Sequence, residues 1–229
     1  WEEYTHIPGN AVSGYENLTK EISKSKLPKS YFLGVLGMPG MTAYVGLNKF
    51  GKPKKCETIF ISAASGAVGQ VVGQIAKIKG LRVIGSASSD SKLKYLEELN
   101  FDGAFNYKTC NIDEKLTELC PDGIDIYFDN VGGEMLDMVL THLNINSRVV
   151  ACGMISQYNT NAPYGVKNLM HVVTKRITIQ GFIVSDHYQE TESFRKDMDE
   201  WLEQGKLKYK EDIVEGIQNA PEAFLNLLT

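Results

Sequence analysis

Short apolar runs alternate with segments of helical periodicity through most of this chain. The runs are rich in β-branched and aromatic residues, as strands are, whereas the segments between them repeat apolar residues every three to four positions. The expected strands are 58–62, 82–86, 103–107, 124–128, 148–152 and 177–181, and the expected helices are 43–50, 67–79, 91–99, 113–120, 134–143, 168–174, 191–204 and 221–228. Strands separated by helices at this spacing pair in parallel, so we predict an α/β fold with an open, doubly wound parallel sheet.

A glycine-rich turn, residues 64–69 (Ala-Ser-Gly-Ala-Val-Gly), lies between the first expected strand and the next helix. Gly66 and Gly69 occupy the second and third glycine positions of the dinucleotide fingerprint G-x-G-x-x-G, and Ala64 replaces the first. The second glycine lets the backbone approach a pyrophosphate, the third lets the helix pack closely on the strand, and the helix N-terminus offers N–H groups to the anion. This context favours a dinucleotide site; the alternative is a tight glycine turn in another α/β fold.

The end of the second expected strand indicates which dinucleotide the turn would bind. An NAD enzyme usually carries Asp or Glu roughly 20 residues after the turn, where the carboxylate holds the ribose 2′-hydroxyl. This chain has the hydroxyl-rich stretch 86–89 and then Lys92, groups that would bind a 2′-phosphate. We expect Asp90, the carboxylate of this stretch, to cap the following helix. The pattern favours NADP(H); the alternative for Lys92 is a solvated lysine at a helix start.

Polar residues also follow the third and fourth expected strands, where the ligands of such sheets bind. Asn106 and Tyr107 lie at the carboxyl end of the third strand, and Asp129 and Asn130 at that of the fourth. Residues 131–133 (Val-Gly-Gly) then allow another close approach of the backbone. The alternatives are a surface aromatic for Tyr107 and a turn former for Asn130.

The charge and cysteine patterns exclude several classes of protein. Lys and Arg number 24 and Asp and Glu 28, so the formal net charge is −4, and no basic block occurs. We therefore expect no nucleic-acid partner. No apolar run approaches the ~20 residues of a membrane span, and the first residues do not resemble a signal peptide. The four cysteines form no C-x-x-C pair, which favours free thiols in a reducing compartment, and we expect a cytoplasmic protein without a membrane partner.

Several consecutive motifs are specific to one family. They are 1–4 (WEEY), 36–44 (LGMPGMTAY), 62–69 (SAASGAVG), 105–108 (FNYK), 127–133 (YFDNVGG), 152–159 (CGMISQYN) and 180–186 (QGFIVSD). With these the chain closely resembles the zinc-independent medium-chain dehydrogenases/reductases, in particular the NADP-dependent alkenal double-bond reductases of plants and the prostaglandin (leukotriene B4 12-hydroxydehydrogenase) reductases of animals. The plant branch is the more similar, from residues 153–158 and 180–186.

The resemblance implies a Rossmann sheet with remnants of a GroES-like catalytic domain at both ends. Residues 1–35 would be the edge of that catalytic domain, 36–187 the NADP(H)-binding domain, and 188–229 the helices that lead back to the catalytic domain. The chain begins without Met and ends inside an amphipathic pattern, so we expect an internal fragment of a longer protein. The family also implies a homodimer.

The resemblance assigns roles to residues. Gly66, Ala67, Val68 and Gly69 would hold the pyrophosphate, Lys92 and Tyr107 the 2′-phosphate, and Asn130 the ribose and pyrophosphate. The nicotinamide end would be lined by Thr42, Cys152, Gly153, Ser156, Tyr158, Phe182, Ile183 and Val184. The alternatives are strand-end core for residues 182–184 and a small buried apolar side chain for Cys152.

The implied activity is NADPH-dependent reduction of the carbon–carbon double bond of α,β-unsaturated aldehydes and ketones. Where the family has a tyrosine linked to substrate and enolate contacts, this chain has Thr174, whose hydroxyl is much less acidic than a phenol with its pKa of ~10. Tyr158 is therefore the catalytic candidate, and a packing role is the alternative for this residue. The ribose 2′-hydroxyl of the cofactor is the alternative proton donor.

Two other functions stay open from the sequence: a quinone reductase, and a nucleotide-binding protein without catalysis. We expect no metal, because the four histidines are isolated along the chain and no cysteine lobe for structural zinc occurs. The physiological substrate does not follow from the sequence.

Overall fold

The structure is a computed structural model that describes residue 6 and residues 22–226. The 1–4 motif and the end of the helix expected at 221–228 lie outside the described residues. The chain divides into two compact units: Leu33–Lys208, and a second unit made of Trp1–Phe32 and Tyr209–Thr229.

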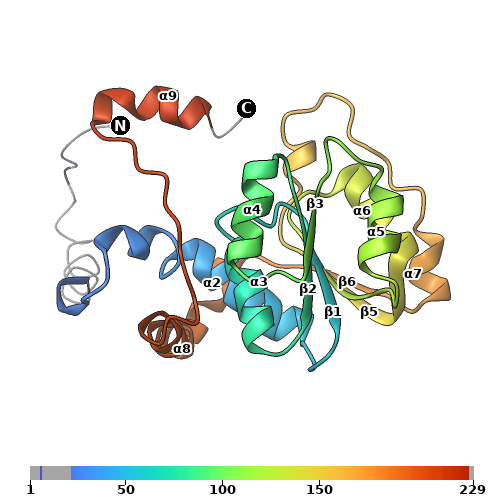
Figure 1. Ribbon diagram of the computed structural model, residues 1–229, viewed down its shortest axis with the longest axis horizontal. Helices are drawn as coiled ribbons and strands as arrows, with labels where there is room; N and C mark the ends of the chain where they lie inside the picture. Colours follow the sequence, from blue (N-terminus) through green and yellow to red (C-terminus); the bar gives the residue numbers. More distant parts are fainter. Residues whose placement is uncertain (1–5, 7–21, 227–229) are drawn as a thin grey trace. The chain divides into compact units, whose positions relative to one another are not determined.

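The larger unit is built on a six-stranded parallel sheet (Figure 1). Its strands are β1 (Thr58–Ile61), β2 (Arg82–Ala87), β3 (Gly103–Asn106), β4 (Ile124–Asp129), β5 (Leu143–Ala151) and β6 (Thr178–Gly181). The strand order is β3-β2-β1-β4-β5-β6, which confirms the predicted doubly wound Rossmann sheet. The order reverses between β1 and β4, and the crevice at the carboxyl ends of these two strands is where such sheets bind ligands.

Helices cover both faces of the sheet. Figure 1 shows α3 (Gly69–Ile78) and α4 (Asp90–Glu98) on one face, and α5 (Ile112–Leu119) and α6 (Gly133–His142) on the other. The remaining helical elements are α2 (Met38–Val45), the π-helix η3 (Gly46–Gly51), α7 (Met170–Thr174), α8 (Thr191–Glu203), α9 (Ala220–Leu225) and the 3₁₀ turns η2 (Lys29–Leu33), η4 (Ile155–Gln157), η5 (Val184–Glu190) and η6 (Ile217–Asn219). None of the helices among the described residues is long and apolar enough to cross a membrane.

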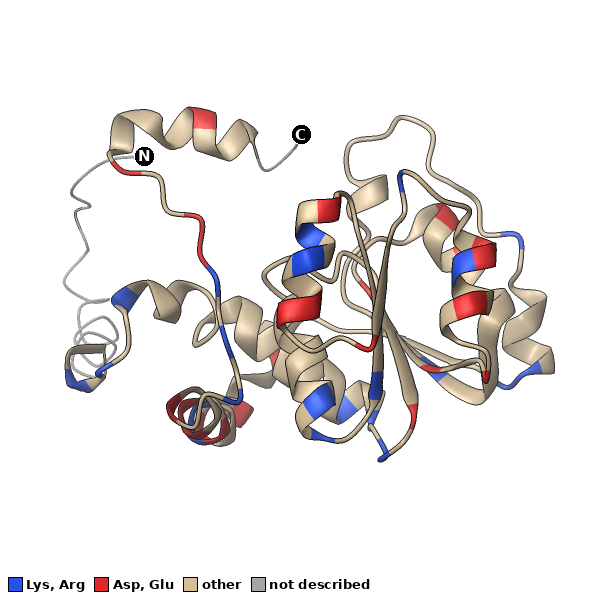
Figure 2. Ribbon diagram, viewed as in Figure 1, with Lys and Arg blue, Asp and Glu red and all other residues tan. Residues whose placement is uncertain are grey.

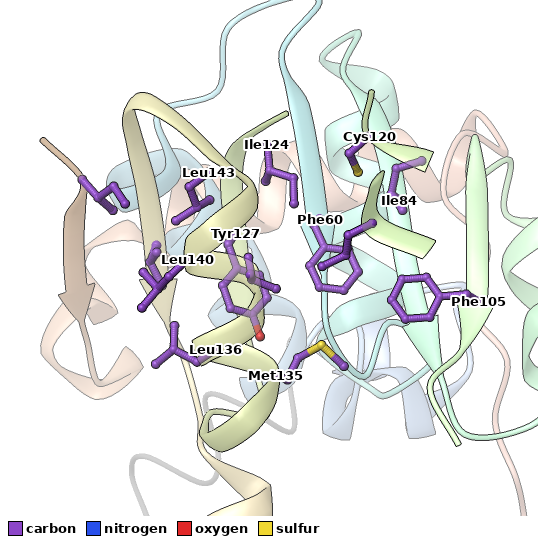
Figure 3. Close-up of a cluster of buried hydrophobic side chains, with 14 residues drawn as sticks. Phe60, Ile84, Phe105, Cys120, Ile124, Tyr127, Met135, Leu136, Leu140 and Leu143 are labelled. Atoms are coloured by element: carbon purple, nitrogen blue, oxygen red, sulfur yellow. The ribbon is translucent and has the colours of Figure 1, made fainter. Parts of the chain in front are cut away.

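The core between the sheet and the α5–α6 layer holds the sheet rigid (Figure 3). Phe60 on β1 stacks on Phe105 of β3 and on Tyr127 of β4, with ring centroids 5.8 and 5.4 Å apart. Leu116 of α5 and Val139 of α6 are fully buried against these rings. Because burial of each such side chain contributes roughly 1.5–3 kcal/mol, the strand ends that carry the site are held on a well-packed layer.

The helix expected at 43–50 begins earlier than predicted. Glycines, methionines and Pro39 made the preceding stretch resemble a loop, but α2 starts at Met38. Proline fits the first helical turn, where its missing N–H is not needed, and at Gly40 a side chain would collide with the carbonyl of Val35. Gly80, with φ of +80°, ends α3 as expected.

The compact unit that contains the sheet ends at Lys208. Helix α8 belongs to it: Phe194 and Met198 are buried, and the Tyr44 hydroxyl donates a 2.7 Å hydrogen bond to Asp197. In the second unit, the rings of Tyr31 and Tyr209 meet edge to face at 5.5 Å. The assignment of the end segments to a catalytic domain stays a prediction.

Candidate functional site

The turn after β1 depends on one residue in a left-handed conformation. Ala63 has φ of +47°, and the next residue, Ala64, is fully buried and donates its N–H to the carbonyl of Ser86 at 2.9 Å. The fingerprint comparison assigned the missing first glycine to Ala64, but the residue with positive φ is Ala63. The turn leads the chain from β1 into α3, and the hydrogen bond from Ala64 to Ser86 links it to β2.

The two glycines of the turn differ in their surroundings. A Cβ at Gly69 would lie 2.5 Å from the carbonyl oxygen of Ala63 and 2.8 Å from the Cα of Ala64, so α3 packs on the turn only because residue 69 lacks a side chain. Gly66 is exposed, and a Cβ there would lie 3.2 Å from its nearest neighbour, the carbonyl oxygen of Ala63. In the described part of the chain, the N–H groups of Ala67 and Val68 have no acceptor. The turn therefore presents donors at a helix N-terminus, as an anion site requires.

Hydroxyls and a lysine gather where β2 ends. The Lys92 ammonium donates to the Ser88 hydroxyl at 3.1 Å. The prediction that Asp90 caps α4 is wrong: the hydroxyl of Ser89 accepts the N–H of Lys92 at 3.4 Å, and Asp90 instead accepts the side-chain N–H of Asn106 at 3.1 Å. Ser89 caps α4 because its backbone is extended, whereas Asp90 already lies in the first turn of the helix.

Tyr107 lies beside this group. Its N–H donates to the carbonyl of Ala87 at 3.2 Å, because Asn106 on β3 pairs with Ala87 at the end of β2. The ring is 39% exposed. Lys92 and Tyr107 thus follow neighbouring strands at one edge of the sheet, as the sequence predicted, while their role toward a 2′-phosphate stays a prediction.

A buried carboxylate organises the switch point between β1 and β4. Asp129 is fully buried, and its Oδ1 accepts the hydroxyl of Tyr127 at 2.7 Å and the N–H groups of Val131 and Gly132 at 2.9 and 2.8 Å. Burial raises the pKa of Asp129, although these donors oppose the rise. Its Oδ2 has no partner among the described residues. The sequence marked Asp129 only as a polar strand end; the Gly-Gly pair after it was the signal for an Asx-type turn.

Asn130 ties the two strands together at the same point. Its side-chain N–H donates to the carbonyl of Ser62 at 2.7 Å, and its backbone N–H donates to the Ser62 hydroxyl at 3.0 Å. These bonds fix the amide so that its oxygen remains an acceptor. Asn130 is therefore more than a turn former here, and it lies at the edge where the resemblance predicted it.

The segment after β5 supplies the other predicted residues. The N–H groups of Cys152 and Gly153 donate to the Asp129 carbonyl, and Ser156 donates its hydroxyl to Val131 at 2.6 Å. Burial, with the nearby Asp129 charge, raises the pKa of the Cys152 thiol to about 12, so this sulfur is a small neutral group at neutral pH. The oxygen of Tyr158, which is 64% exposed, accepts the N–H of Met154 at 3.0 Å, which leaves the phenol hydrogen free to be donated.

The remaining predicted residues lie after β6 and on α2. Phe182 stacks on Phe50 of η3 with centroids 5.0 Å apart, Ile183 is 65% exposed, and Val184 is buried. Thr42 donates its hydroxyl to the Met38 carbonyl one turn earlier, so it lies on a helix and not at a strand end.

Comparison with known proteins identifies the family. The family model described as zinc-binding dehydrogenase matches residues 67–204. The chain belongs to the zinc-binding dehydrogenase family. Relatives match over the whole of this chain: a zinc-type alcohol dehydrogenase-like protein of Schizosaccharomyces pombe is 49% identical, and a 2-alkenal reductase (NADP(+)-dependent) of Nicotiana tabacum is 46% identical. The chain spans 65% and 66% of the lengths of these two relatives.

A solved structure extends the comparison to three dimensions. CurA from Vibrio vulnificus, in complex with NADPH, is 46% identical and superposes with a TM-score of 0.84 over 90% of this chain and 63% of that chain. Although the chain belongs to this family, its described residues contain no group of three or more His, Cys, Asp or Glu side chains that could hold a metal ion. The expectation that no metal is needed stays a prediction.

Proposed function

We propose that the protein to which this chain belongs reduces the carbon–carbon double bond of α,β-unsaturated aldehydes and ketones with NADPH. The observation that carries the proposal is the edge formed by the free N–H groups of Ala67 and Val68 together with Lys92 and Ser88, where an NAD site would have a carboxylate. The tobacco relative that is named an NADP-dependent 2-alkenal reductase and the NADPH complex of CurA support it.

The residues present fit NADP(H). Within the turn 66–69, the N–H groups of Ala67 and Val68 would bind the diphosphate, since the N–H of Gly66 already donates to the Ala63 carbonyl at 3.0 Å. Lys92 and Tyr107 would bind the 2′-phosphate. The Asn130 amide oxygen, held by Ser62, would accept a ribose hydroxyl. The nicotinamide end would be lined by Thr42, Cys152, Gly153, Ser156, Tyr158, Phe182, Ile183 and Val184.

When bound, NADPH would supply a hydride to the β-carbon of the substrate, which leaves an enolate. We assign the proton for the α-carbon to the Tyr158 hydroxyl, because its hydrogen is free and the N–H of Met154 would stabilise the phenolate that remains. Thr174 is less suited, because its hydroxyl donates to the Met170 carbonyl within α7. Water would then reprotonate Tyr158.

We further propose a cytoplasmic homodimer. All four cysteines are free thiols, which fits a reducing compartment. Among the described residues, strand β6 pairs with β5 alone, so its other edge presents backbone groups that no described strand pairs with, and all four of its residues are exposed. A second copy would cover this edge.

The test is a turnover screen on the full-length protein. NADPH consumption would be followed with 4-hydroxynonenal, with a simple enone and with a quinone, beside a binding titration with NADPH alone. Consumption with the enal supports the proposal. Turnover of the quinone without the enal would assign a quinone reductase, and tight NADPH binding with no turnover would assign a nucleotide-binding protein.

A further inference from the structure

A second buried carboxylate lies on α6, outside the site described above. Asp137 is 4% exposed. Its Oδ1 accepts the N–H groups of Lys167 and Asn168 at 2.9 and 2.8 Å, and its Oδ2 accepts the hydroxyl of Tyr164 at 2.9 Å. The side chain of Asn168 donates back to the Asp137 carbonyl at 3.1 Å. A buried carboxylate is costly unless it is hydrogen-bonded, and all these donors come from one stretch, residues 164–168.

That stretch is the far end of the β5–α7 segment, residues 153–169. Apart from the short turn η4, Figure 1 shows the segment leaving β5 and returning to α7 without regular structure. Long irregular connections of this kind are entropically costly to order, and those found in compact domains are usually functional. The segment carries Tyr158, to which we assign the proton transfer.

The near end of the segment is fixed to the β4–α6 turn. The Tyr164 N–H donates to the side-chain oxygen of Gln157 at 2.7 Å, and Gln157 donates to the Ser156 hydroxyl, also at 2.7 Å. Ser156 in turn bonds to Val131. A Cβ at Gly133, whose φ is +58°, would collide with the Gln157 and Ser156 side chains, so this glycine permits the contact.

These bonds form a continuous path from α6 through the segment to the switch point. Asp137 and Tyr164 form one end of the path, and Ser156 with Val131 forms the other. Tyr158 lies next to Gln157 within this path. Its own position depends on the bond from Met154, which lies in the same segment.

We propose that Asp137 is a positioning residue that clamps the β5–α7 segment, so that Tyr158 is held in place for proton transfer. The clamp itself is a feature of the chain, whereas its effect on turnover rests on the proposed function.

The experiment compares four variants of the full-length protein. Asp137→Ala removes every acceptor of the clamp, Asp137→Asn keeps an oxygen for the two backbone N–H groups, and Tyr164→Phe removes one bond. Val139→Ala, two residues further along the same helix, removes fully buried apolar atoms without touching the clamp and is the control for stability. Two quantities are measured: the rate of trypsin cleavage after exposed Lys167 under native conditions, and the kcat and KM for an enal and for NADPH.

Trypsin should cleave Asp137→Ala after Lys167 about tenfold faster than the parent, and the kcat of this variant should be about tenfold lower. Its KM for NADPH should change less than about threefold, because residues 66–69 and Lys92 are untouched. Asp137→Asn should stay within about threefold of the parent in every measure, and Tyr164→Phe should fall between the two. Val139→Ala should lower the Tm and leave cleavage and kcat unchanged.

If trypsin cleaves Asp137→Ala at the same rate as the parent protein, the proposed clamp is refuted. It is also refuted if Val139→Ala, with a Tm equal to that of Asp137→Ala, shows the same loss in kcat. If Asp137→Ala does not fold, Tyr164→Phe decides: cleavage and kcat equal to the parent would overturn the proposal. If the parent protein turns over no enal, the proposed function fails, but the cleavage comparison still tests the clamp.

Discussion

Single backbone positions decide whether the turn after β1 can present its N–H groups. Ala63 adopts a left-handed conformation that usually favours glycine, and Gly69 lies where the backbone leaves no space for a side chain. The fingerprint identified Gly69 by its spacing but gave no sign of the left-handed conformation at Ala63, because a motif fixes spacing and does not report φ. Asp137 was not assigned a role because its donors lie 27 to 31 residues away in the sequence. The donors to Asp129 are local, and the Gly-Gly pair after it was a signal that the sequence reasoning did not use.

Gly69→Val should disrupt both the turn and cofactor binding. The nearest atoms to a side chain at this position are backbone atoms of Ala63 and Ala64, which cannot rotate away, so α3 must shift from β1. We expect the free energy of unfolding to fall by roughly 1–3 kcal/mol or more and NADPH affinity to fall by more than about tenfold. Calorimetric titration and thermal unfolding measure the two effects. Gly165→Ala is the control, because nothing lies within 4 Å of a side chain added there and the residue is outside the turn. Unchanged NADPH affinity in Gly69→Val would refute this role.

Lys92→Ala should weaken NADPH more than NADH. The ammonium contacts only the Ser88 hydroxyl among the hydrogen bonds of the described residues, so the fold does not depend on it. Loss of a charge-assisted bond to the 2′-phosphate should cost about 1.5–3 kcal/mol, roughly 10- to 100-fold in the Kd for NADPH. Titrations of both nucleotides test this, with exposed Lys94→Ala on the same helix as the matched control. Equal losses for the two nucleotides would remove Lys92 from the 2′-phosphate site.

Elements were predicted well where periodicity is strong and less well at their ends. All six strands lie where apolar runs were found, although β5 begins at Leu143, five residues before the expected start, because its first half carries polar and exposed residues. Helix α2 was shortened in the prediction because Pro39 and Gly40 resemble a turn. The alternation of strands and helices predicted the doubly wound sheet but not the order of its strands, since periodicity alone does not order strands.

An ion pair connects β5 to the start of β1. The Arg148 guanidinium donates to both oxygens of Glu57 at 2.9 and 2.6 Å and to the Gly51 carbonyl at 2.8 Å. Burial alone would raise the pKa of Glu57, but Arg148 and the N–H of Lys54 together hold it below the usual value. A lowered folded-state pKa contributes stability above the unfolded pKa of ~4.3, and this contribution is lost as the pH falls through the folded value.

Glu57→Gln should therefore lower the free energy of unfolding at neutral pH by roughly 1–2 kcal/mol, which appears as a lower Tm. The gap in Tm between the variant and the parent should narrow below about pH 4. Thermal unfolding over a pH series measures the gap. Glu118→Gln, which removes an exposed pair with Lys115, is the control and should change little. A gap that stays constant with pH would contradict the lowered pKa of Glu57.

Strand β6 leads to a prediction about assembly. Ile179 is 39% exposed on this edge strand, and a charge there opposes pairing with another strand. Ile179→Lys should shift the full-length protein from dimer to monomer in sedimentation velocity. Thr117→Lys on α5, which contacts β3 at the opposite edge of the sheet, adds the same charge and should leave the dimer intact. A dimer that persists in Ile179→Lys would exclude β6 as the interface.

At the scale of the whole molecule, the chain holds a compact α/β unit, Leu33–Lys208, and segments from both ends that form a second unit. Figure 2 shows acidic and basic positions interspersed along α4 and α5, in keeping with the absence of a basic block in the sequence. The sheet unit carries every residue assigned to the cofactor, from Thr42 to Val184. The chain spans about two thirds of its relatives, so turnover is a property to be measured on the full-length protein.

The most direct test of this account is a crystal structure of the full-length protein soaked with NADPH. The diphosphate should lie against the N–H groups of Ala67 and Val68, with the 2′-phosphate within hydrogen-bond distance of the Lys92 ammonium. A nucleotide bound away from the carboxyl ends of β1 and β4, or a 2′-phosphate that does not contact Lys92, would contradict it.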